Sequence, residues 1–142
     1  MRHLFTAVLA GTALLSAAAP VAAAPVVPAR AEFQCNLGFM PTKPTVGVGS
    51  IVGNAWAKCS VAPEVHHMTL TLERRDGGAW VSEEIAHSDK IPAPREVYEV
   101  KTRCMPGVWR VAATASGSLG GTPFAFTDFS MERFITAPEC KR

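Results

Sequence analysis

The chain has 142 residues, which is enough for one domain with one hydrophobic core, and it contains four cysteines and eleven prolines. Its formal net charge is only +2, from 14 basic and 12 acidic residues. This balance lacks the excess of lysine and arginine that a surface for nucleic acid or for anionic membranes normally shows, so neither partner is expected.

Residues 1–31 have the three parts of a secretory signal peptide: a basic start, an apolar run, and an end of small residues and prolines. The alternative, a retained membrane anchor, is disfavoured because the run is short and rich in alanine. Cleavage after Ala31 fits an A-x-A site, and cleavage after Ala23 is the other option. The first site predicts a secreted, extracellular domain formed by residues 32–142.

The predicted leader holds two basic residues and no acidic one, so 12 residues of each sign remain and the mature chain has no net charge. All the cysteines lie in the mature chain, and an even number in a small exported chain predicts two disulfides. A metal site is the alternative, but it would need a close pair such as C-x-x-C, and no two cysteines are closer than 24 positions. The four residues are Cys35, Cys59, Cys104 and Cys140.

Short segments rich in valine, threonine, isoleucine and aromatic residues alternate with turn signals along the mature chain. This spacing is typical of an all-β sandwich or barrel. The predicted strands, in chain order, are 32–37, 50–60, 66–75, 79–86, 95–104, 107–115 and 122–135. Within the last segment, a helical turn over 128–134 with Asp128 as its cap is the alternative.

Strict alternation of apolar and polar residues identifies the face that a strand buries. The segment 66–75 alternates in this way, and the Asp-Gly-Gly sequence that follows it favours a tight hairpin. In the segment 107–115, Trp109, Val111 and Ala113 share one face directly after a Pro-Gly turn. We therefore predict that Trp109 is a buried anchor of the core.

Two stretches, MPGVWRVAATA (105–115) and LTLERRDGGAWV (70–81), resemble parts of small secreted bacterial immunoglobulin-like domains. In that family an aromatic residue after a turn pins a corner between strands of the two sheets, and Trp109 stands where tyrosine is common. The resemblance implies a single immunoglobulin-like antiparallel β-sandwich of about seven strands over 32–142. It does not imply a central disulfide between the sheets, because the cysteine-tryptophan-cysteine spacing of antibody domains is absent.

The same resemblance implies how the cysteines pair. If strands alternate in direction as in such a sandwich, Cys35 and Cys59 share one end of the domain, and Cys104 and Cys140 share the other. We therefore predict the disulfides Cys35–Cys59 and Cys104–Cys140, and loops of this size stabilise a domain by about 3–4 kcal/mol each in the chain-entropy model.

No group of residues in the sequence has the pattern of a catalytic or metal centre. His66 and His67 are neighbours, so on a strand they point to opposite faces and do not readily bind one ion. Glu83 and Glu84 fail as a carboxylate pair for the same reason. The sequence therefore predicts a protein that is not an enzyme and that holds no cofactor and no metal.

Two tryptophans are predicted to be partly exposed. Trp56 shares its strand face with Asn54 and Lys58, and Trp80 shares its face with Ser82. Aromatic side chains beside polar groups commonly form recognition surfaces. Trp56 and Trp80 are therefore the candidate partner-binding residues.

These patterns favour a secreted, non-catalytic interaction module, whose partner is another secreted protein or a component of a cell surface or cell wall. The alternative is a secreted protease inhibitor in which the segment Arg103–Met105, braced by Cys104, enters a protease pocket. A small hydrolase is the third option, and the lack of a converging nucleophile and base disfavours it.

Overall fold

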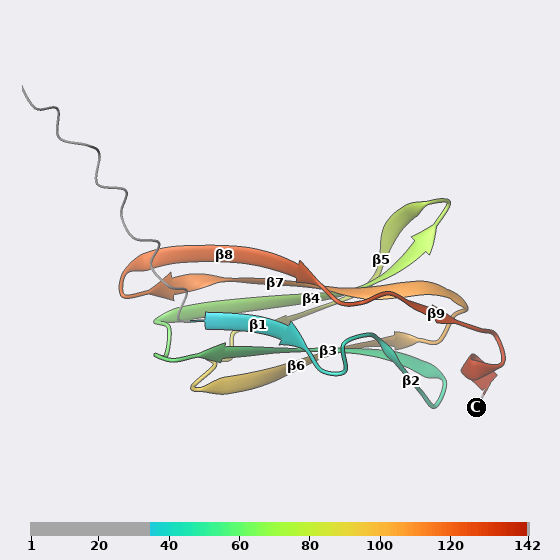
Figure 1. The fold of residues 1–142 in the computed structure, drawn as a ribbon, viewed down its shortest axis with the longest axis horizontal. Helices are drawn as coiled ribbons and strands as arrows, with labels where there is room; N and C mark the ends of the chain where they lie inside the picture. Colours follow the sequence, from blue (N-terminus) through green and yellow to red (C-terminus); the bar gives the residue numbers. More distant parts are fainter. Residues whose placement is uncertain (1–34, 142) are drawn as a thin grey trace, which may run out of the picture. The chain divides into compact units, whose positions relative to one another are not determined.

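The computed structural model describes residues 35–141, which form an all-β domain of two antiparallel sheets (Figure 1). This described part has nine strands, no α-helix and one short 3-10 helix, η1 (Glu139–Lys141). The all-β class and the two-sheet arrangement are confirmed, whereas the expected count of about seven strands is wrong. The predicted signal peptide and both of its cleavage sites lie outside the described residues.

The four-stranded sheet is built around β3 (Ser50–Cys59). One side of β3 pairs along nearly its whole length with β6 (Arg95–Arg103). The other side pairs in succession with β2 (Thr45–Gly47) and β1 (Cys35–Phe39). One edge of this sheet is therefore a single long strand, and the other edge is a strand broken into two pieces.

The five-stranded sheet is built around β4 (Val65–Asp76) and β7 (Gly107–Leu119). The hairpin partner of β4 is β5 (Ala79–Ser88), which forms one edge. The free side of β7 pairs in succession with β9 (Arg133–Ile135) and β8 (Thr122–Phe129). This sheet therefore also has one continuous edge and one broken edge.

The two breaks explain the additional strands. The first follows β1, where Pro41 and Pro44 have no N–H to donate to a ladder. The second follows β8, where the buried Ser130 hydroxyl accepts the backbone N–H of Val111 at 2.8 Å in place of a carbonyl. The last predicted strand is therefore two strands with a short loop between them, and the helical turn considered for 128–134 is absent.

The broken edges of the two sheets bond to each other. The backbone N–H of Met131 donates to the carbonyl of Thr42 at 2.9 Å, and the Arg133 guanidinium donates to the carbonyl of Pro44 at 3.0 Å. Each break therefore directs its polar groups toward the other sheet, which closes the sandwich at this edge.

The inward faces of the two sheets form one core, and Trp109 is its largest fully buried side chain, with 0% exposure. The Trp109 indole N–H donates to the carbonyl of Met105 at 3.0 Å, so the only polar group of the ring is satisfied inside the core. This confirms the prediction that Trp109 is a buried anchor. The remaining members of the core are Ile51, Ala55, Ala57, Met68, Leu70, Leu72, Tyr98, Val100, Val111, Ala113, Ala115 and Ile135.

Both predicted disulfides are present, and none of the described cysteines is free. Cys35–Cys59 joins neighbouring strands β1 and β3 within the four-stranded sheet. Cys104–Cys140 joins the end of β6 to η1, which follows the last strand of the other sheet. The second bond therefore ties the four-stranded sheet to the C-terminal segment of the five-stranded sheet.

Replacing Trp109 with alanine should lower the free energy of unfolding by about 3–5 kcal/mol, because it removes buried contacts and leaves a cavity. The measurement is the urea midpoint of the purified domain. Val108→Ala is the matched control, since Val108 is the outward-facing neighbour and its truncation should cost about 1 kcal/mol or less. Equal midpoints for the two variants would contradict the anchoring role of Trp109.

Candidate functional site

The outer face of the five-stranded sheet contains Trp80, one of the two candidate binding residues. The strand register places Trp80 opposite Arg75, and Glu73 opposite Arg110 on the neighbouring strand. The Arg110 guanidinium lies 4.2 Å from the centre of the Trp80 ring and 4.1 Å from that of Phe129, and Arg75 lies 4.8 Å from the Trp80 ring. Two cations thus cover the half-buried Trp80 ring.

Both of these arginines also have carboxylate partners. Arg110 donates to Glu73 at 2.7 Å, and Arg75 lies 3.4 Å from Glu132. The two arginines that cover Trp80 are therefore neutralised by carboxylates of the same domain.

The outer face of the four-stranded sheet contains Trp56, the other candidate binding residue. Residues of β3 and β6 that are cross-strand partners share a face, and on both strands the outward positions are the more exposed ones. We define the β3–β6 face as the partly or fully exposed outward residues Val52, Asn54, Trp56, Lys58, Arg95, Val97, Glu99, Lys101 and Arg103.

Trp56 lies down on the sheet instead of standing away from it. Its cross-strand partner on β1 is Gly38, and a Cβ atom at Gly38 would lie 2.5 Å from the indole ring. Only glycine lets the ring come this close to the β1 backbone. The Arg95 guanidinium lies 5.1 Å from the centre of the same ring, so the half-buried indole carries one cation.

The basic side chains of the β3–β6 face have no carboxylate within ion-pair distance among the described residues: Lys58, Arg95, Lys101 and Arg103. Elsewhere in the described part, Arg74, Arg75, Lys90, Arg110 and Arg133 are all paired. Lys58 and Arg95 are moreover direct cross-strand partners, and like charges in that position repel. The face therefore carries positive charge that the protein leaves uncompensated.

The histidines do not converge on one point. His66 points into the core, where its ring lies between those of Tyr98 and Phe124 at 6.0 and 6.3 Å, while His67 points outward to Asp89. His87 bonds to the Thr69 hydroxyl at 3.0 Å. Within residues 35–141, no group of three histidine, cysteine or acidic side chains is arranged to hold a metal ion.

The buried His66 and Tyr98 form a small polar network. The Tyr98 hydroxyl donates to the carbonyl of Lys90 at 3.0 Å and lies 3.4 Å from Nδ1 of His66. Burial lowers the pKa of His66 and, with a contribution from Glu96, raises the pKa of Tyr98 to about 12. Both groups are therefore neutral at pH 7, and their role is to hydrogen-bond polar atoms that lie inside the domain.

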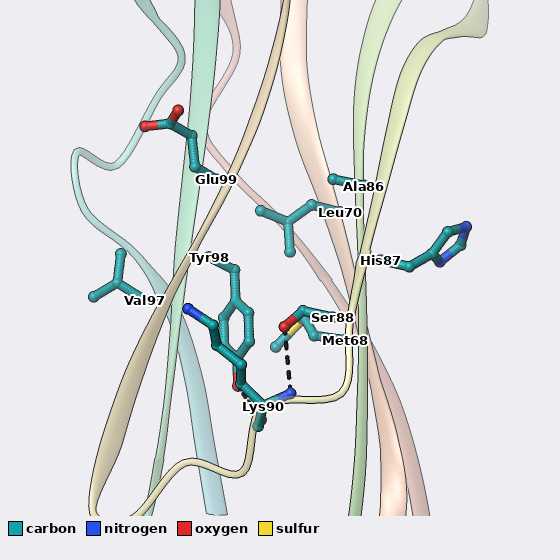
Figure 2. Close-up of a pocket in the computed structure, with 9 residues that line it drawn as sticks. All are labelled: Met68, Leu70, Ala86, His87, Ser88, Lys90, Val97, Tyr98 and Glu99. Carbon is teal, nitrogen blue, oxygen red and sulfur yellow. Dashed lines mark hydrogen bonds between the residues drawn. The ribbon is translucent and has the colours of Figure 1, made fainter.

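A hollow of about 270 Å³ lies at the open edge between β5 and β6 (Figure 2). Met68 and Tyr98 point toward each other there, whereas His87 points away. The ammonium group of Lys90 is 3.1 Å from Glu96, so this lysine is already paired. The lining residues of this hollow do not include a nucleophile hydrogen-bonded to a base.

The segment nominated as a protease-binding loop does not project from the domain. Arg103 ends β6 and is paired with Ser50, and Cys104 is held by its disulfide. Met105 packs against the core and accepts the hydrogen bond from Trp109. The segment therefore serves as the corner between the two sheets.

Comparison with known proteins gives no match: no family model, no curated protein and no solved structure aligns significantly with this chain. In the described part, no helix has the length and apolar character needed to span a membrane. The case for a function therefore rests on the side chains and their arrangement.

The domain should lose stability as the pH falls below about 6.5, the ordinary pKa of histidine. Because burial lowers the pKa of His66, the unfolded chain binds more protons than the folded one as the pH falls through 6.5, so in this range stability rises with pH. The His66→Gln variant removes this proton uptake, so its urea midpoint should change less between pH 7 and pH 5 than that of the wild type. His87→Gln, at an exposed position, should keep the wild-type dependence, and identical profiles for His66→Gln and wild type would refute the assignment.

Proposed function

We propose that this protein is a secreted, non-catalytic binding module whose partner docks on the β3–β6 face. The observation that carries the proposal is that the four cations of this face, one of which lies over Trp56, have no carboxylate within ion-pair distance among residues 35–141, whereas the other arginines of that range are paired. Interfaces are enriched in tryptophan and arginine, and charge complementarity guides partners to them.

The choice of Trp56 over Trp80 rests on what surrounds each ring. Arg75 and Arg110 cover Trp80 and are themselves neutralised, so a partner would have to break a complete network to reach it. Trp56 has one cation over its ring, at 5.1 Å from the centre, and that cation has no carboxylate partner among the described residues. Trp56 is therefore the residue to which we assign binding, and Trp80 has a structural role.

The proposed location is extracellular, because two disulfides are typical of small exported domains and a signal peptide is predicted at residues 1–31. The partner is a secreted protein or a component of a cell surface or cell wall. We also propose an immunoglobulin-like sandwich, supported by the two facing antiparallel sheets and by Trp109 near the start of β7, directly after the corner. The protease inhibitor is the less favoured alternative, because Met105 is packed against the core.

The double variant Lys101→Glu/Arg103→Glu should lose at least about tenfold of its affinity for the native partner, because it reverses two charges at an interface. The readout is retention of the purified domain on envelope material and on immobilised culture-medium proteins from the producing cell. The control is Lys43→Glu/Lys141→Glu, which makes the same change in charge outside the face and should bind like the wild type.

Equal retention of wild type and both double variants would refute docking on the β3–β6 face. Loss of retention by Trp80→Ala alone would instead move the site to the other sheet.

A further inference from the structure

We propose that the ligand of the β3–β6 face is an acidic polysaccharide in which sugars that carry a carboxylate alternate with neutral sugars. This inference rests on the proposed function and specifies its partner. It follows from the order in which charge, aromatic surface and hydrogen-bonding groups occur along the face.

The positive charges of the face lie at its two ends. Along β6 every second residue faces outward, and the eight residue steps from Arg95 to Arg103 span about 26 Å at a strand rise of 3.3 Å per residue. Lys58 lies beside Arg95 at one end, and Lys101 lies next to Arg103 at the other. A ligand that satisfies both ends must be extended and must carry negative groups that are well separated.

The middle of the face suits a neutral, hydroxyl-bearing unit. Asn54 and Glu99 are cross-strand partners there, and together they offer an amide that donates and oxygens that accept. Sugar hydroxyls both donate and accept hydrogen bonds, so they complement this pair. Glu99 is also the only acid in the β3–β6 face, and its carboxylate would repel a chain that has a negative charge on every unit.

The Trp56 end of the face suits a sugar that carries a carboxylate. The indole ring approaches the Gly38 backbone closely, and the cross-strand neighbour Val97 is 54% exposed, so the two side chains give this end of the face an apolar surface, which we call the Trp56 platform. The C–H groups of a sugar ring can lie against the electron-rich face of an indole. The Arg95 guanidinium lies over the same ring, 5.1 Å from its centre, and in the complex it would turn aside to bind the carboxylate of that sugar through two parallel hydrogen bonds, which uncovers the ring for the sugar.

The same features disfavour the other polyanions. Nucleic acid carries a phosphate on every nucleotide, which would place negative charge over Glu99. A peptide made of acidic residues alone has no ring to lie on the Trp56 platform. Proteins commonly bind an anionic membrane surface through an amphipathic helix, and the described part has no α-helix.

The test is isothermal titration calorimetry with hyaluronan oligosaccharides, in which a uronate alternates with a neutral amino sugar. The wild-type domain should bind them at least about tenfold more tightly than neutral chitin oligomers of equal length, with affinity that falls as salt rises. Lys101→Gln/Arg103→Gln should lower the affinity about tenfold, while the control Lys141→Gln should stay within about twofold.

Two further variants test the two central features separately. Gly38→Ala keeps every binding group but displaces the Trp56 ring, and it should weaken hyaluronan binding about fivefold. Glu99→Gln should strengthen binding to polygalacturonate, which has a carboxylate on every sugar, about threefold or more. The same change should leave hyaluronan binding within about twofold of the wild type.

Stronger binding of polyglutamate, single-stranded DNA or anionic vesicles than of hyaluronan would overturn the inference in favour of that class of partner. Failure of hyaluronan to bind, while retention on native material still requires Lys101 and Arg103, would overturn the polysaccharide and leave the proposed function intact. If retention does not require them either, both proposals fail.

Discussion

The two sheets depend on the burial of Trp109. Its ring is fully buried in the core, and its indole N–H is satisfied by the carbonyl of Met105 in the turn between β6 and β7. The residue before Met105 is Cys104, whose disulfide reaches η1 after the last strand. One side chain and one covalent bond therefore fix the corner where the chain passes from the four-stranded to the five-stranded sheet.

The two outer faces differ in how their charged side chains are paired. On the five-stranded sheet, each arginine has a carboxylate partner, as in the contact of Arg110 with Glu73, and Arg110 also lies over the Trp80 ring. On the four-stranded sheet, Lys58 and Arg95 face each other with no acid between them. A domain gains nothing in stability from such a pair, since like charges in direct cross-strand contact repel. The β3–β6 face is thus the surface at which an external anion would relieve a repulsion that the fold itself retains.

The sequence predicts the core much better than it predicts the site. Alternation with a period of two marks the buried residues of β4 and β7 because burial of one sheet face is a local property of each strand. The cross-strand contact of Lys58 with Arg95 joins residues far apart in the chain, and register of that kind leaves no local signal. The overall composition has almost no net charge, so it gives no sign of the basic face. Trp56 and Trp80 cannot be distinguished as binding residues until their cross-strand neighbours are known. The break between β8 and β9 leaves no sequence signal, because there the Ser130 side chain replaces a ladder hydrogen bond.

We propose that this domain recognises an acidic ligand through Trp56 and not through Trp80. The chain has three tryptophans, so the indole N–H signals in a nitrogen-15 NMR spectrum report separately on the β3–β6 face, the opposite face and the core. On titration with hyaluronan oligosaccharides, binding at the β3–β6 face should shift the Trp56 signal in a saturable way, while the Trp80 and Trp109 signals should stay in place. A shift of the Trp80 signal with an unchanged Trp56 signal would contradict it.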